Sequence, residues 1–99
     1  MSGDALLSAI GLCRRAGMLA LGFDASCVAV RKGAPLVIVA SDAAQRTVRN
    51  IRLQCGPGTR ILETNRTREQ LGSVVGKEMA VAAITDKNFA RLIQEAVGK

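Results

Sequence analysis

Arginine is the residue type best placed to do chemistry in this sequence, and the chemistry it suits is phosphate binding. Arg14 and Arg15 are adjacent, while Arg46, Arg49 and Arg52 recur at three-residue steps. The chain has 14 basic and 8 acidic residues, which gives a formal net charge of +6. A small basic protein favours a polyanionic partner such as a nucleic acid, although the same charge would also serve solubility alone.

Groups suited to catalysis are few. The chain has no His, which excludes histidine-based general catalysis and most zinc sites. The carboxylates form no local cluster, and several fall where helix caps are expected. Cys13, Cys27 and Cys55 each fall on the apolar phase of a helical pattern, so we interpret them as core residues in a reducing compartment. We therefore expect no enzyme activity, no cofactor and no metal site.

A glycine turn offers a second kind of phosphate ligand. Gly22 opens a helical pattern, and the backbone N–H groups from there to Ala25 have no acceptor within the helix. Such groups can donate to phosphates or base edges. Phe23 and Phe89 are the only aromatic residues, so the chain has no platform for stacking single-stranded bases. We therefore expect recognition of a structured RNA at the start of this second helix.

Helices and strands that alternate along the chain must position these groups. Hydrophobic periodicity predicts helices over 2–16, 22–32, from a Ser41-Asp42 cap to 55, from a Thr67 cap to 76, and from a Thr85-Asp86 cap onward. Apolar runs predict strands over 18–21, 36–40, 60–64 and 79–84. The fold class is therefore α/β, a three-layer α/β/α sandwich with a four-stranded, largely parallel or mixed sheet, in one domain of residues 1–99.

The sequence also bears on location. No stretch is long and apolar enough to cross a membrane, and the Arg14-Arg15 pair follows the first apolar segment, the reverse of a secretory signal. We expect a cytoplasmic monomer with no membrane partner.

Several segments, taken in order and spacing, resemble the ribosomal-protein family of kink-turn RNA binders, the large-subunit proteins seven-Ae and thirty-e, and most closely its short bacterial YlxQ-like branch. The segments are Leu12-Cys13-Arg14-Arg15-Ala16-Gly17, Gly22 with Ala29-Val30-Arg31-Lys32-Gly33, Leu36-Val37-Ile38-Val39-Ala40-Ser41-Asp42-Ala43, Leu71-Gly72 with Val75-Gly76-Lys77, and Val81-Ala82-Ala83-Ile84-Thr85-Asp86-Lys87. The resemblance covers nearly the whole chain.

The resemblance implies a non-catalytic, ribosome-associated protein that binds kink-turn RNA, with ribosomal RNA and ribosomal proteins as partners. It implies that the RNA is gripped at the start of the second helix by a motif of the form G-x-N-E-x-x-K, and by a loop before the last strand. Together with the basic residues, the predicted RNA-binding set is Arg14, Arg15, Gly22, Phe23, Asp24, Ala25, Val28, Arg46, Lys77, Glu78, Met79 and Ala80.

Three residues depart from that motif. Asp24 stands at the Asn position, Ala25 at the Glu position and Val28 at the Lys position. An ionised Asp only accepts hydrogen bonds and is equally suited to stabilising the helix start, whereas Ala and Val side chains make none. Each missing charge-assisted hydrogen bond costs roughly 1.5–3 kcal/mol. The alternative is therefore a protein-interaction module of the same fold that has lost strong kink-turn binding. A nucleotide-binding enzyme is suggested only by the layered fold.

Overall fold

A computed structural model describes residues 4–97 of the chain, so the predicted cap Ser2 lies outside the described residues. The helices are α1 (Ala5–Arg15), α2 (Phe23–Arg31), α3 (Gln45–Gln54), α4 (Arg68–Gly72) and α5 (Lys87–Val97). The strands are β1 (Leu19–Leu21), β2 (Leu36–Val39), β3 (Arg60–Glu63) and β4 (Val81–Ile84). This order of elements confirms the predicted α/β class.

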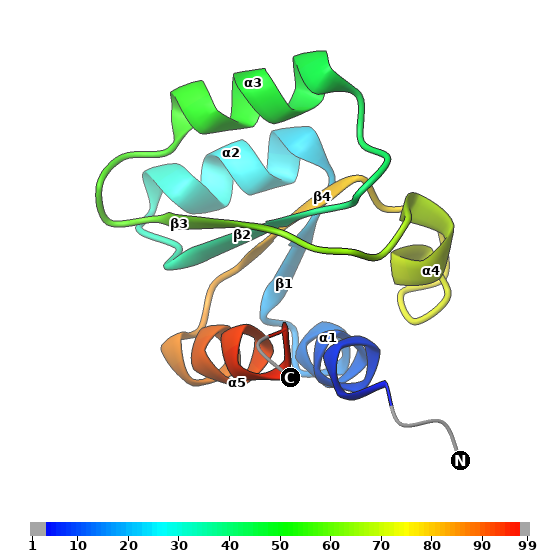
Figure 1. The fold of residues 1–99 in the computed structure, drawn as a ribbon. Coiled ribbons are helices and arrows are strands. Elements are labelled where there is room, and N and C mark those ends of the chain that lie inside the picture. Colours follow the sequence, from blue (N-terminus) through cyan, green and yellow to red (C-terminus); the bar gives the residue numbers. More distant parts are fainter. Residues whose placement is uncertain (1–3, 98–99) are drawn as a thin grey trace.

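The strands form one sheet in the order β1-β4-β2-β3. Strands β2 and β3 are parallel, whereas β4 runs antiparallel to both of its neighbours, β1 and β2. The sheet is therefore mixed, which decides between the two forms that the sequence left open. Helices α2 and α3 cover one face, and α1 and α5 cover the other (Figure 1), so the three-layer sandwich is confirmed.

Strand direction divides the sheet into two edges. The strands β1, β2 and β3 point the same way, because β1 and β2 are both antiparallel to β4. We call the edge where these three strands end, and β4 begins, the carboxyl edge. The opposite edge, where they begin and β4 ends, is the amino edge. The helices α2 and α3 start at the carboxyl edge and return toward the amino edge.

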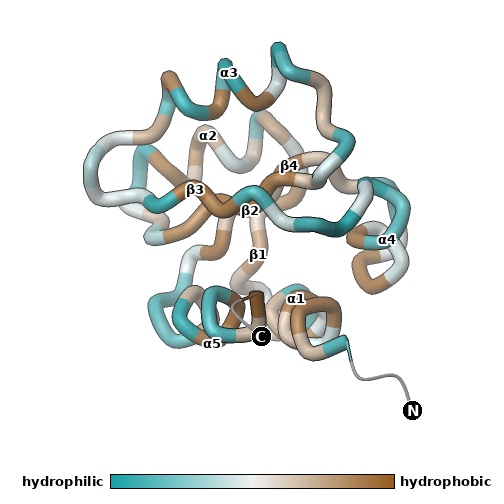
Figure 2. Tube along the Cα trace, viewed as in Figure 1, coloured by the Kyte–Doolittle hydropathy of each residue, from teal (hydrophilic) through white to brown (hydrophobic). Residues whose placement is uncertain are grey.

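Two apolar clusters hold the layers together. Alternate residues of β2 point to opposite faces, so Leu36 and Ile38 join the cluster beneath α1 and α5, whereas Val37 and Val39 join the cluster beneath α2 and α3. All four are buried, as the uninterrupted apolar run predicts. Figure 2 shows hydrophobic residues along the central strands and hydrophilic residues along much of α3.

Most predicted helix starts are confirmed. Asp4 caps α1 by accepting a hydrogen bond from Leu7 N–H at 3.0 Å. Thr67 and Gln70 form the complete capping box of α4, and the Asp86 carboxylate accepts from Phe89 N–H at 2.9 Å at the start of α5. These local bonds depend on residues three apart, which is why the sequence reveals them.

Three predictions about helices were wrong. Helix α3 has Ala44 at its cap, because the Asp42 carboxylate instead accepts from Arg68 N–H at 2.8 Å. Helix α4 ends at Gly72, and the chain continues as turns, not as helix, to residue 76. Leu92, predicted on the inner face of α5, is 44% exposed.

Candidate nucleic-acid interface

Helix α2 begins at the carboxyl edge, directly after Gly22. Any other residue at this position would be strained. Gly22 has φ +91°, and its N–H donates to the Val81 carbonyl of β4 at 3.0 Å. Ser26 N–H makes the first intrahelical bond, to the Gly22 carbonyl at 3.0 Å. Gly22 offers no capping side chain, so the N–H groups of residues 23–25 have no intrahelical acceptor. They form a set of donors aimed outward along the helix axis.

The loop of residues 77–80 lies beside this helix start, because it leads directly into β4. The Ala80 carbonyl accepts from Ala40 N–H at 2.9 Å, and Met79 N–H donates to the Arg68 carbonyl at 3.3 Å. The Met79 side chain is 2% exposed and packs in the core, so this predicted RNA-binding side chain anchors the loop and offers no surface. Lys77 and Glu78 are exposed.

Gly72 fixes the path of this loop, a role that sequence reasoning missed. A Cβ atom at Gly72 would lie 2.5 Å from the Lys77 carbonyl oxygen and 2.9 Å from the Glu78 Cα. Both atoms belong to the backbone and cannot rotate away. The Leu71-Gly72 sequence on its own carries no signal of this approach, because the partner is five residues further along.

Arg46 lies in the first turn of α3, which starts at the same edge as α2. Helices α2 and α3 pack side by side (Figure 1). Arg46 is exposed and makes no ion pair with any residue of the described chain, 4–97. The predicted residues Gly22 to Ala25, Lys77, Glu78 and Arg46 therefore share one edge of the sheet.

Two other arginines of this edge are already neutralised. Arg66 pairs with Asp4 at 3.0 Å, and Arg68 pairs with Asp42 at 3.7 Å. The hydrogen bond from Arg66, followed by that from Leu7 N–H, lowers the pKa of Asp4. These pairs hold the segment after β3 against α1 and against the segment after β2.

The outward face of α2 carries the departures from the expected motif. Asp24 and Ala25 are exposed, and the Val28 side chain is 46% exposed. Ala25 and Val28 line an apolar cleft of about 320 Å³ with Ala20 and Ala29. Phe23 is half-buried against the core under α2 and offers no free ring.

Arg14 and Arg15 lie at the opposite edge from Gly22. They end α1, and the chain enters β1 through Met18, whose carbonyl accepts from Thr85 N–H at 3.0 Å where β4 ends. The whole of β1 therefore separates them from Gly22. The structure does not bring these two predicted residues together with the rest of the set.

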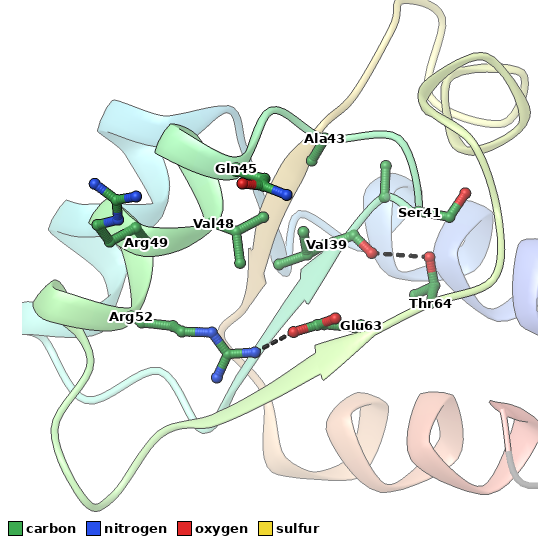
Figure 3. Close-up of a pocket in the computed structure, with 10 residues that line it drawn as sticks. Val39, Ser41, Ala43, Gln45, Val48, Arg49, Arg52, Glu63 and Thr64 are labelled. Atoms are coloured by element: carbon green, nitrogen blue, oxygen red, sulfur yellow. Dashed lines mark hydrogen bonds and ion pairs between the residues drawn. The ribbon is translucent and has the colours of Figure 1, made fainter.

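A cleft of about 580 Å³ beside α3 opens between that helix and β3 (Figure 3). Arg52 pairs with Glu63 across it, and the Thr64 hydroxyl donates to the Val39 carbonyl at 2.9 Å. In Figure 3 the Arg49 guanidinium points away from the cleft. The side chains of Arg52, Glu63 and Thr64 are therefore already bonded within the protein.

The cysteines have the character of core residues. Burial, with a smaller contribution from the Asp86 carboxylate, raises the pKa of the Cys13 thiol to about 11. Burial also raises the pKa of Cys27 and of Cys55. These thiols are protonated at neutral pH and are poor nucleophiles.

Within residues 4–97, no helix has the length and apolar character needed to span a membrane.

Comparison with known proteins identifies the family. The model of the ribosomal protein L7Ae/L30e/S12e/Gadd45 family matches residues 4–93. The chain belongs to this family. A protein of unknown function from Bacillus halodurans C is 30% identical, with a TM-score of 0.87 over 97% of this chain and 99% of that one. No curated protein sequence matches.

A more distant structure shares the L7Ae fold. The 15.5-kDa RNA-binding protein of Giardia lamblia is 21% identical, with a TM-score of 0.75 over 99% of this chain and 95% of that one. Family membership confirms the resemblance seen in the sequence, whereas assignment to the YlxQ-like branch stays a prediction.

Proposed function

We propose that this L7Ae-family chain binds structured RNA at the carboxyl edge of its sheet, and that kink-turn RNA is the preferred form. The main support is that the outward-facing N–H groups of residues 23–25 lie beside the loop 77–80, with Arg46 at the same edge of the sheet. Backbone donors at a helix start bind phosphates and base edges, and the exposed cations Lys77 and Arg46 add positive charge to this edge.

Binding, not catalysis, is the role that this edge supports. Two of its carboxylates are held in ion pairs, Asp4 with Arg66 and Asp42 with Arg68, and burial keeps the Cys13 thiol protonated by raising its pKa to about 11. The name of the Giardia lamblia structure, an RNA-binding protein of the same fold, supports the same class of role. We extend the proposal to a ribosomal or ribosome-associated RNA in the cytoplasm.

The test is a pair of binding isotherms for the purified chain, one with a kink-turn RNA and one with a plain RNA duplex of equal length. Each isotherm is repeated over a salt series. The proposal predicts a kink-turn preference of at least about tenfold, which corresponds to about 1.4 kcal/mol, and a steep loss of affinity as salt rises. Absence of binding to both RNAs at low salt would contradict it. Recovery of RNA with the chain from cells, with and without nuclease, then identifies the natural RNA.

A protein-interaction module is the second candidate, and one observation favours it. Val28 is 46% exposed beside the apolar cleft of α2, where a charged residue of the expected motif would stand. In that case Val28→Asp would abolish capture of a protein partner and leave RNA binding unchanged. Loss of RNA binding in Val28→Asp, with the fold intact, would favour the first proposal.

A further inference from the structure

The amino edge of the sheet holds a cluster of cations that the proposed interface does not use. A cleft of about 530 Å³ lies between the start of β3 and helix α5. Arg60, Lys87 and Arg91 line this α5 cleft, together with Pro35, Gln94 and Glu95. Three cations and one carboxylate therefore meet in a single open depression.

The helix dipole does not explain the position of one of these cations. Lys87 lies in the first turn of α5, where the positive end of the helix dipole disfavours positive charge. Arg91 lies one turn further along α5 and lines the same cleft. In contrast, Arg14, Arg15 and Arg31 lie in the last turns of their helices, where the dipole favours them. Arg60, Lys87 and Arg91 are exposed and make no ion pair with residues 4–97.

The surroundings of the α5 cleft strengthen its charge. Helix α1 packs along α5, and α1 ends at the edge where α5 begins. Helix α2 ends at the same edge, with Lys32 beside Thr85. The cations gathered at the amino edge are Arg14, Arg15, Arg31, Lys32, Arg60, Lys87 and Arg91. The carboxylates there are those of Asp86 and Glu95, so this edge carries most of the +6 charge of the chain.

We propose that the amino edge is a second nucleic-acid surface, which grips the phosphate backbone of double-stranded RNA through the α5 cleft. Phe23 and Phe89 both pack against the core, so this edge has no ring on which an unpaired base can stack. A duplex presents phosphates and riboses, and its bases are not free to stack. Lys and Arg side chains without aromatic neighbours are suited to binding those phosphates. The inference rests on the proposed function only in taking RNA as the polyanion.

Charge reversal at Lys87 separates a binding role from a structural one. Lys87→Glu places an acid in the first turn of α5, where the dipole favours it, so the thermal midpoint should stay equal or rise. The affinity for a blunt RNA duplex should nevertheless fall about tenfold when Arg91→Glu is combined with it. The slope of log K against log salt should fall by about 1 for each phosphate that the variant no longer neutralises.

Arg49→Glu is the matched control for Arg91→Glu. Both arginines are exposed, lie on helices and make no ion pair with residues 4–97, and both substitutions change the net charge equally. The proposal predicts a loss of duplex affinity for Arg91→Glu and little change for Arg49→Glu. Equal losses would overturn it, because they would reflect net charge alone.

The outcome also distinguishes this inference from the proposed function. Duplex binding that depends on Lys87 and Arg91, without kink-turn preference, would support the amino edge and contradict the carboxyl-edge proposal. Kink-turn preference with duplex affinity unchanged in Lys87→Glu/Arg91→Glu would do the reverse. Binding to vesicles of anionic phospholipid in the absence of duplex binding would overturn the inference in favour of a lipid surface.

Discussion

The two edges of the sheet are built from opposite kinds of polar group. At the carboxyl edge, backbone N–H groups of residues 23–25 face outward, and Arg66 and Arg68 are matched by carboxylates. At the amino edge, cations outnumber carboxylates and those of the α5 cleft have no partner among residues 4–97. Backbone N–H donors in fixed positions can select an RNA by its shape. Unpaired Lys and Arg side chains attract the phosphate backbone whatever its sequence.

The direction in which the helices run accounts for part of this difference between the two edges. Helices α2 and α3 start at the carboxyl edge and end at the amino edge, so N–H donors collect at one edge and carbonyl groups at the other. Arg31 follows this rule, because it sits in the last turn of α2. Lys87 departs from this rule, because it lies in the first turn of α5.

Displacement of the loop 77–80 should have the largest effect on the carboxyl edge. Gly72→Ala forces a Cβ against the backbone of Lys77 and Glu78, and overpacking of this kind costs about 1–3 kcal/mol of unfolding free energy. Urea denaturation measures the loss. Gly58→Ala is the matched control, because nothing lies within 4 Å of its Cβ position, and it should change stability by less than about 0.5 kcal/mol. Equal stability of the two variants would mean that the loop is not fixed by this close approach.

A positive charge returned to α2 should strengthen the RNA preference of the carboxyl edge. Val28→Lys restores the cation of the expected motif at a 46% exposed position, and a hydrogen bond to a charged phosphate contributes about 1.5 kcal/mol. The preference for kink-turn RNA over duplex should rise about tenfold. Leu12→Lys, at an equally exposed position of α1, should leave the preference unchanged. A rise in both variants would show that added charge, and not its place, is what matters.

The third prediction concerns the acid sensitivity of the carboxyl edge. Asp4 caps α1 and pairs with Arg66, so Asp4→Ala should cost about 1 kcal/mol at neutral pH. The pKa of Asp4 is lowered in the folded chain, so its contribution is complete above the unfolded value of about 3.9 and is lost as pH falls through the folded value.

Unfolding free energies of wild type and Asp4→Ala, measured over a pH series, provide the check. The difference between the two proteins should be constant near neutral pH and shrink below about pH 4. A difference that stays constant into strong acid would mean that ionisation of Asp4 contributes nothing to stability, either through the cap or through the pair with Arg66.

Much of the fold follows from local pattern. The apolar run around Leu36 predicts a buried strand, and Asp4, Thr67 and Asp86 cap helices because each bond spans three residues. The direction of β4 could not be predicted, because an apolar run such as Val81–Ile84 has the same pattern in either direction. Asp42 was wrongly predicted to cap α3. Its hydrogen-bond partner, Arg68 N–H, lies 26 residues further along the chain and leaves no local signal.

The candidate site was predictable only where it is local. The turn at Gly22 was recognisable, but the burial of Met79 depends on its place in the apolar cluster between the sheet and helices α1 and α5. The separation of Arg14 from Gly22 depends on the course of β1, which a linear sequence does not display. The α5 cleft joins Arg60 to Lys87 across 27 positions, and its one local signal is a pair of cations at a helix start.

The division of roles between the two edges is tested by the ratio of affinities for kink-turn RNA and plain duplex, measured at one salt concentration in three proteins. These are wild type, Arg46→Glu/Lys77→Glu and Lys87→Glu/Arg91→Glu. The Arg46→Glu/Lys77→Glu variant should lower the ratio about tenfold toward unity, whereas the Lys87→Glu/Arg91→Glu variant should weaken binding to both RNAs and leave the ratio unchanged. A ratio that falls in the amino-edge variant and survives in the carboxyl-edge variant would contradict the division between the two edges.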